Sequence, residues 1–230
     1  MKRIVIFLAC LLGGAVFADD GARAILEAAR VNPLGNPITL NARIRAGSTA
    51  VPFEIRVQDG KVVYAFENPA QEILLGLGEN SATLEERRGG RMAPISAARF
   101  DDSVRGGLLT YEDLALRFLY WPNPRLLGEE TIRSFKAYKI EIPAPPGQSQ
   151  YGVVRVWIAR DNGAILRIEG YDTDGRLSKR FEIVSAQKLD GQWMLKQMRI
   201  ERIDPETRKV TGRTYLEVTG KGDQAQSGEG

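Results

Sequence analysis

Three short turns in the second half of the chain constrain its fold more than any other feature: Asp161-Asn162-Gly163, Asp174-Gly175 and Asp190-Gly191. Asn-Gly or Asp-Gly between alternating apolar segments is the strongest short-range signal for a β-hairpin, because these residues tolerate a positive φ. Successive hairpins predict a meander of antiparallel strands. We expect its strands at Tyr151–Ile158, Ala164–Tyr171, Arg176–Val184, Gln192–Ile203 and Val210–Val218. A meander specifies a fold, but it supplies no reactive group.

The first half of the chain also has the two-residue alternation of β-strands. Between Ile38 and Arg45, for example, apolar and polar residues alternate, which indicates one buried and one solvated face. About 11 antiparallel strands close most economically as a barrel or a strongly curled sheet, because closure removes exposed edges. The predicted fold is therefore mainly β (α+β). The other strands are expected at 53–58, 61–66, Gln71–Leu77, Ala82–Arg88, Leu126–Arg133 and Ala137–Ile142.

Two segments have helical periodicity instead. In the middle of the chain, Thr110-Tyr111-Glu112-Asp113 is similar to a capping box, and we expect a helix from there to Trp121-Pro122. The preceding residues, Gly89–Gly107, are expected to be irregular. Large barrels enclose space that must be filled, so apolar helices would plug the barrel or cover it as a lid. At the front, Asp19 and Asp20 can cap a short helix with one apolar face, formed by Ala22, Ile25, Leu26 and Ala29.

The N-terminal segment Met1–Ala18 is typical of a secretory signal peptide. Lys2-Arg3 precedes the apolar segment Ile4–Leu12, and Val16-Phe17-Ala18 has the small residues of a cleavage site. Cleavage after Ala18 would remove Cys10, the only cysteine. The mature chain would then have neither a disulfide nor a thiol nucleophile.

The rest of the chain is expected to form a single β domain over residues 19–220, because no low-complexity linker divides it. Residues 221–230 are polar and glycine-rich, which predicts a disordered tail. No segment after the signal peptide is long and apolar enough for a transmembrane span. Lipidation of Cys10 is not expected, because Phe7-Leu8-Ala9 matches a lipoprotein signal at one position only.

The charge distribution argues against a nucleic-acid partner. The formal net charge is +3, and loss of Lys2 and Arg3 with the signal peptide would lower it by two. An evenly mixed, near-neutral surface has no electrostatic footprint for nucleic acid.

The sequence contains no histidine, which excludes a Ser-His-Asp triad and a histidine-ligated metal site. The acidic pairs Asp101-Asp102, Glu112-Asp113 and Glu129-Glu130 are interpreted as structural, because neighbours in a strand point to opposite faces and acids are favoured at helix starts. Ser178-Lys179 has no supporting third group. Asp172-Thr173-Asp174-Gly175 resembles the start of a calcium loop but lacks a helical flank. We therefore predict no catalytic residue, no metal and no cofactor, although a carboxylate-based hydrolase or transferase stays an alternative.

The feature that points most clearly to a function is apolar. Large apolar side chains are concentrated in the central helical segment, at Tyr111, Leu114, Phe118, Leu119 and Trp121. One interpretation is that these residues are ordinary core. The other is that they line or close a cavity for an acyl chain, since burial of each CH₂ contributes about 0.8 kcal/mol. The sequence leaves both interpretations open.

Several stretches together resemble the outer-membrane lipoprotein-sorting protein family (LolA/LolB-like), which consists of exported domains of Gram-negative-type bacteria. They are the signal peptide, Tyr111-Glu112-Asp113-Leu114 at the start of the central helix, and the ordered series Gly152–Ile158, Asp174–Arg180 and Asp190–Met194. The resemblance covers most of residues 38–218.

This resemblance implies a half-open antiparallel β-barrel with helices as a lid over a hydrophobic cavity. Well-studied members carry the acyl chains of lipoproteins across the periplasm. In those carriers an arginine of the barrel, in an Arg-Pro context, holds the lid closed. The present sequence has no Arg-Pro, so no functional residue is transferred from the family.

We therefore expect a non-catalytic, exported periplasmic carrier or binding protein for a lipid or the acyl chains of lipoproteins. Its partners would include an inner- or outer-membrane transfer partner. The alternative is an envelope scaffold or protein-interaction module without a lipid ligand.

Overall fold

The computed structural model describes residues 17–31, 37–58, 60–78, 81–189 and 192–222. Thirteen strands of these residues form one sheet, and all neighbouring strands are antiparallel. The strands are β1 (Ile38–Ala46), β2 (Thr49–Gln58), β3 (Lys61–Phe66), β4 (Gln71–Leu77), β5 (Ala82–Arg88), β6 (Arg91–Pro94), β7 (Arg125–Ile132), β8 (Phe135–Pro143), β9 (Val153–Ala159), β10 (Ile165–Tyr171), β11 (Leu177–Leu189), β12 (Gln192–Ile203) and β13 (Val210–Lys221).

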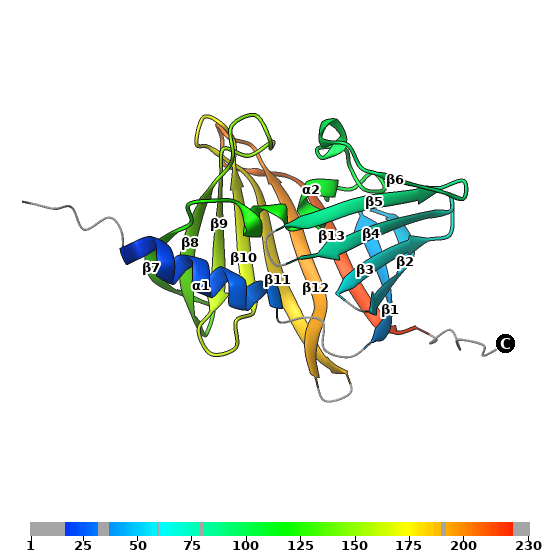
Figure 1. Cartoon of the computed structure of the whole chain (residues 1–230), viewed down its shortest axis with the longest axis horizontal. Coiled ribbons are helices and arrows are strands. Elements are labelled where there is room, and N and C mark those ends of the chain that lie inside the picture. The colour runs from blue at the N-terminus through cyan, green and yellow to red at the C-terminus, as the bar shows by residue number, and fades with distance from the viewer. Residues whose placement is uncertain (1–16, 32–36, 59, 79–80, 190–191, 223–230) are drawn as a thin grey trace, which may run out of the picture.

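The sheet is curled but not closed. Its strand order is β6-β5-β4-β3-β2-β1-β13-β12-β11-β10-β9-β8-β7, so β6 and β7 are edges that do not pair with each other. Figure 1 shows β1–β6 on one side of the molecule and β7–β12 on the other. Of the two forms expected from the sequence, a barrel or a curled sheet, the structure has the open, curled sheet.

Every segment that the sequence predicts as a strand is a strand in the structure, but the expected number of about 11 is too low. Twelve segments were named as strands, and the thirteenth strand is β6, inside the segment that was expected to be irregular. It has only four residues, all of them exposed, and it ends in a proline. So short a strand shows no alternation of apolar and polar residues, and sequence patterning cannot detect it.

The predicted front helix is present as α1 (Phe17–Val31). Ala22 and Leu26 are fully buried, and Ile25 and Ala29 pack against the same core. Asp19 and Asp20 lie within the helix instead of preceding it. Of the predicted signal peptide, residues 1–16 lie outside the described residues. The same holds for residues 223–230 of the predicted disordered tail.

The prediction of one continuous central helix is wrong. Thr110 caps a helix of four residues, α2 (Tyr111–Leu114), in a complete capping box with Asp113. The chain then passes through Leu116, which has a left-handed φ of 48°, into the 3₁₀ helix η2 (Arg117–Tyr120). A bulky residue with positive φ is strained, so local preference alone does not produce this break. Tertiary contacts on both sides of the segment, described below, account for it.

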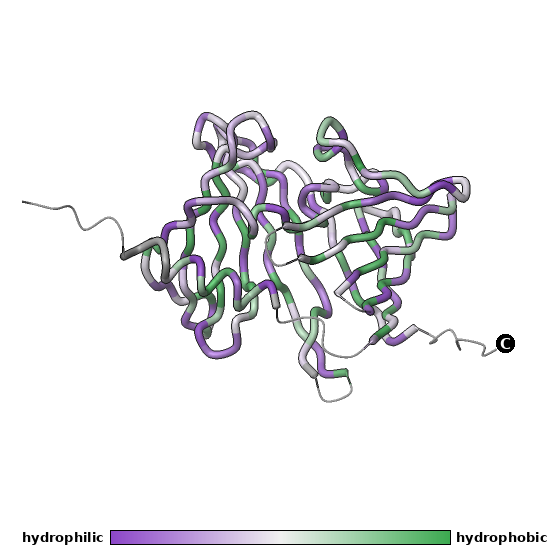
Figure 2. The backbone as a smooth tube through the Cα atoms, viewed as in Figure 1, coloured by the Kyte–Doolittle hydropathy of each residue, from purple (hydrophilic) through white to green (hydrophobic). Residues whose placement is uncertain are grey.

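The half of the sheet from β7 to β13 has one apolar and one charged face. Figure 2 shows the alternation of hydrophobic and hydrophilic residues along its strands. One cross-strand row, which belongs to the core, contains Ile140, Val156, Ile168, Phe181 and Ile200. The neighbouring row on the opposite face alternates in charge across seven strands: Arg125, Glu141, Arg155, Glu169, Arg180, Glu201 and Arg213.

Candidate functional site

The central segment Thr110–Trp121 lies inside the curl of the sheet, where Figure 1 shows α2 between the two halves. All five residues singled out from the sequence are buried and belong to the main core cluster. Their exposed fractions are 3% for Tyr111, 7% for Leu114, 1% for Phe118, 3% for Leu119 and 5% for Trp121.

The structure thus brings these five residues together, and the rings of Phe118 and Trp121 meet edge to face with centroids 6.3 Å apart. They do not line the two grooves that lie over the half of the sheet with β1–β6. Their role in binding an acyl chain stays a prediction.

Tyr111 connects the central segment to β4 and β5. Its hydroxyl donates to Glu86 Oε1 at 3.2 Å and accepts from Gln71 Nε2 at 3.0 Å. Arg99, in the 3₁₀ helix η1 (Ala97–Arg99), donates to Glu86 Oε2 at 2.7 Å and lies over the Tyr111 ring, 5.2 Å from its centroid. Burial raises the pKa of Tyr111. A tyrosine phenol is protonated at neutral pH even at its ordinary pKa of about 10, so Tyr111 can act as a donor there.

Asp113 connects the same segment to the other half of the sheet. Its Oδ2 lies 2.8 Å from Lys179 Nζ on β11, and its Oδ1 accepts from the Tyr151 hydroxyl at 2.7 Å. The Asp113 and Lys179 side chains are 0% and 9% exposed, so the ion pair is buried. Tyr151 can lie here because position 170 is glycine: a Cβ at Gly170 would be 2.3 Å from the Tyr151 ring.

Glu112 lies between Tyr111 and Asp113 and is fully buried, but one of its carboxylate oxygens lacks a hydrogen bond in the described part of the chain. Its Oε2 accepts from Gln150 at 3.5 Å, while Oε1 has no hydrogen-bond partner among the described residues. Burial raises the pKa of Glu112 and the adjacent Asp113 raises it further, against the side chains of Ser149 and Gln150, which favour the ionised form. The carboxylate form of Glu112 is thus disfavoured in the folded protein.

The four residues Tyr111–Leu114 therefore tie the two halves of the curled sheet together. This role was missed from the sequence, where Glu112-Asp113 was interpreted as a helix-start feature and Ser178-Lys179 as unsupported. One signal was available: Lys179 is in phase with Phe181 on the inner face of a strand. A charge on an apolar face needs a buried partner.

Helix α1 lies against this segment. It makes its main contacts with the edge strand β7 and with η2. Arg30, in the last turn of α1, donates from Nε to the carbonyl oxygen of Leu119 at 2.8 Å. Its guanidinium also lies 4.4 Å from the centroid of the Tyr120 ring. Arg30 thus anchors the C-terminal end of α1 to η2.

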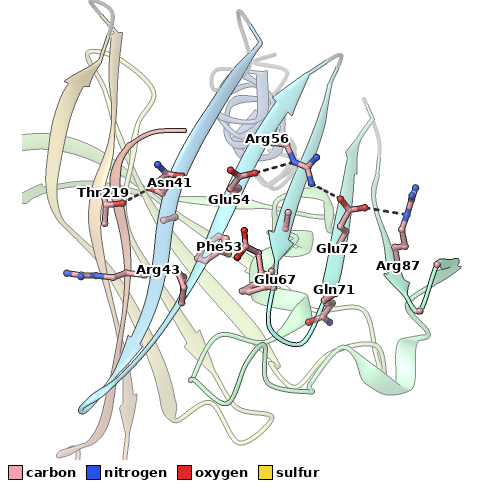
Figure 3. Close-up of a pocket in the computed structure, with 17 residues that line it drawn as sticks. Asn41, Arg43, Phe53, Glu54, Arg56, Glu67, Gln71, Glu72, Arg87 and Thr219 are labelled. Atoms are coloured by element: carbon pink, nitrogen blue, oxygen red, sulfur yellow. Dashed lines mark hydrogen bonds and ion pairs between the residues drawn. The ribbon is translucent and has the colours of Figure 1, made fainter. Parts of the chain in front are cut away.

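A groove of about 930 Å³ lies on the other half of the sheet, over β1–β5. Figure 3 shows Glu54, Arg56, Glu72 and Arg87 projecting from one face of β2–β5. Arg56 Nη2 lies 2.6 Å from Glu72 Oε1, and Arg87 Nε lies 3.4 Å from Glu72 Oε2. Phe53 and Phe66 also line this groove, so its charged row lies beside apolar side chains. The alternating charges suit a polar segment of a partner.

The described residues offer little for catalysis. Among them, no group of three or more Cys, Asp or Glu side chains is arranged to hold a metal ion. Glu112 and Asp113 are enclosed in the core and line neither groove. Within the same part of the chain, no helix has the length and apolar character to cross a membrane.

Residues 88–220, more than half of the chain, match the model of a family described only as uncharacterized protein. The chain belongs to that family. No curated protein sequence matches it.

Solved structures share its fold. A domain from Vibrio parahaemolyticus, described as an outer membrane lipoprotein-sorting protein domain, superposes with a TM-score of 0.69 at 18% identity, over 92% of this chain and 95% of its own. A DUF1329 family protein from Desulfovibrio piger has a TM-score of 0.67 at 20% identity, covering 87% and 90%. A LolA superfamily protein from Nitrosomonas europaea has a TM-score of 0.62 at 18% identity, covering 89% and 94%. The chain shares the fold of these three structures, which confirms the resemblance drawn from the sequence.

Proposed function

We propose that the protein is an exported, non-catalytic periplasmic carrier for a lipid or the acyl chains of lipoproteins, formed by a single domain over residues 19–220. The observation that supports this most is the placement of α1. Its apolar face is fully buried at Ala22 and Leu26, yet its main contacts are an edge strand and η2. A helix held in this way can move without breaking the sheet.

In this proposal α1 is the lid. The large apolar residues of the central segment are buried, so in this proposal an acyl chain enters the core only when α1 moves away. The acyl chain then makes contacts with the core in place of those that Leu26 makes. Each buried CH₂ contributes about 0.8 kcal/mol, so a long acyl chain can offset the lost contacts of the helix.

A pair of substitutions separates binding from stability. Leu119→Ala should lower the affinity for a fluorescent fatty-acyl probe, because Leu119 lies beneath the end of α1 and is 3% exposed. Leu84→Ala, at a residue of β5 that is 6% exposed, is the matched control. Both should destabilise the fold by about 2–5 kcal/mol. If the two variants bind the probe equally well, or the wild type shows no saturable binding, the carrier proposal fails.

The alternative, an envelope scaffold or protein-interaction module, is favoured by a different observation. The charged groove over β1–β5 lies near the exposed edge strand β6, and an extended peptide can add to such an edge. Arg56→Glu with Arg87→Glu would replace two positive charges of the groove by negative ones. Loss of one stoichiometric partner from this variant, with no lipid in the wild-type protein, would support the scaffold over the carrier.

A further inference from the structure

The β11–β12 hairpin projects beyond the rest of the sheet, as Figure 1 shows. Its two arms pair with each other as far as Leu189 opposite Gln192. On the flanks, pairing stops earlier: β10 reaches only Glu182 of β11, and β13 reaches only Gln197 of β12. The end of the hairpin is therefore a two-stranded ribbon without sheet neighbours.

This ribbon carries the most exposed large apolar side chain of the described residues. Trp193 is 72% exposed, whereas Trp121 and Trp157 are 5% and 2% exposed. Within the described part of the chain, the side chain of Trp193 makes no hydrogen bond and no ring contact. Lys188 stands directly opposite it on β11 and is also exposed. A tryptophan presented in this way contributes nothing to the core, so its surface is available for a ligand.

The same end of the sheet carries a second exposed aromatic residue. Strands β7, β9 and β11 all end there, because neighbouring strands are antiparallel. At the β7–β8 turn, Phe135 is 47% exposed. The neighbouring Arg133 donates to the carbonyl oxygen of Val184 at 3.0 Å, which places this turn beside β11. Two exposed aromatic side chains thus project from one end of the molecule.

This end of the sheet carries several exposed cations. Its exposed cations are Arg133, Lys136, Arg160, Lys188 and Lys196. Two of these cations are paired with acids: Arg160 lies 2.9 Å from Glu129, and Arg133 lies 3.9 Å from Glu182. Asp161 is a further exposed acid of this end, and the sequence adds Asp190, which lies outside the described residues. The exposed lysines are Lys136, Lys188 and Lys196.

We propose that this end of the sheet, with Trp193 and Phe135 as its apolar tips, docks on the surface of a lipid bilayer that contains anionic headgroups. Tryptophan is favoured at the membrane–water interface, where its ring is apolar and its N–H meets polar headgroups. Lysine and arginine near an anionic surface add electrostatic attraction. A bilayer matches both features, and docking does not depend on whether the protein carries an acyl chain.

Vesicle binding of the full chain, as recovered from cells that export it, tests this proposal. Vesicles of phosphatidylcholine with phosphatidylglycerol should bind the wild type, and vesicles of phosphatidylcholine alone should bind it less. Trp193→Ser with Phe135→Ser should weaken binding by about tenfold or more. Lys188→Gln with Lys196→Gln should weaken binding to the anionic vesicles alone, also by about tenfold. The N-terminus is the same in all variants, so the differences report on this end of the sheet.

Val210 and Lys209 provide matched controls, because they are exposed at the β12–β13 turn, at the opposite end of β12. Val210→Ser with Lys209→Gln should bind vesicles like the wild type. Vesicle addition should also shift the tryptophan emission to the blue in the wild type and leave it unshifted in the Trp193→Ser variant. Equal vesicle binding by all variants overturns the proposal. So does loss of a co-purifying protein from the Trp193→Ser variant without vesicle binding by the wild type.

Discussion

At the scale of single residues, the interior of the curled sheet depends on a few polar side chains. The Asp113–Lys179 pair is the most buried ion pair of the described residues, and both partners have further hydrogen-bond partners in Tyr151 and Gln150. Removal of one partner from such a pair leaves an uncompensated buried charge, which is more destabilising than the pair itself is stabilising.

Lys179→Met should therefore lower the free energy of unfolding by about 3–5 kcal/mol. Urea unfolding of the purified protein measures this loss. The control is Lys139→Met, which removes an ion pair of similar length, 2.6 Å, from a more exposed site next to Glu130. This control should cost about 1 kcal/mol or less. Equal losses in the two variants would show that the Asp113–Lys179 pair has no special role.

Glu112 predicts a dependence of stability on pH. The pKa of Glu112 is raised in the folded protein. Below the pKa of about 4.3 that a glutamate has in the unfolded chain, Glu112 is protonated in both states and its contribution to folding stability is complete. This contribution is lost as the pH rises through the pKa of the folded state. Glu112→Gln should therefore be more stable than the wild type at neutral pH. The difference should vanish near pH 4 and below. Urea unfolding at several pH values measures it.

Glu217 is the control, because its pKa is shifted in the opposite direction to that of Glu112. Burial raises its pKa, but hydrogen bonds from Arg45, Arg43 and Gln197 outweigh burial and lower the pKa to about 2. The contribution of ionised Glu217 to folding stability is complete above the pKa of a glutamate in the unfolded chain, and it is lost as the pH falls toward 2. Glu217→Gln should thus be less stable than the wild type at neutral pH. A pH-independent difference for Glu112→Gln would contradict the account of that residue.

At the scale of elements, the sheet was largely predictable from the sequence and the central segment was not. Hairpin turns such as Asp174-Gly175 are local: Gly175 has a φ of 77°, and Asp172 Oδ1 accepts from the backbone N–H groups of residues 174 and 176. Strand alternation is local as well. The break at Leu116 is imposed by contacts with strands more than sixty residues away, as from Asp113 to Lys179. No local pattern contains that information.

The lid role of α1 makes a prediction about local opening. Arg30→Met removes the hydrogen bonds to the Leu119 carbonyl oxygen and keeps most of the apolar stem. Amide hydrogens of α1 should exchange faster in this variant, while those of the central strand β9 should keep their wild-type protection. Hydrogen exchange with mass spectrometry measures both.

Uniform acceleration of exchange in α1 and β9 would mean that Arg30 stabilises the whole fold, and unchanged exchange in α1 would mean that Arg30 does not hold the helix. Either result would contradict the description of α1 as a separately anchored lid.

At the scale of the whole molecule, one curled sheet presents three different surfaces. Its interior is apolar and is crossed by the central segment. Its outer face over β1–β5 carries the charged groove, and the end with Trp193 projects into solvent. A carrier needs an apolar interior to hold its cargo and a surface that meets the membrane. In the two proposals made above, the interior of the curled sheet takes up the cargo and the end with Trp193 meets the membrane.

Native mass spectrometry of the protein recovered from its own cell envelope tests the central claim most directly. If α1 covers an interior that takes up acyl chains, part of the protein should carry the mass of one lipid or lipopeptide, and Arg30→Met should alter that fraction. A protein that shows only its own mass, both as recovered and after incubation with acyl lipids, would contradict the carrier account.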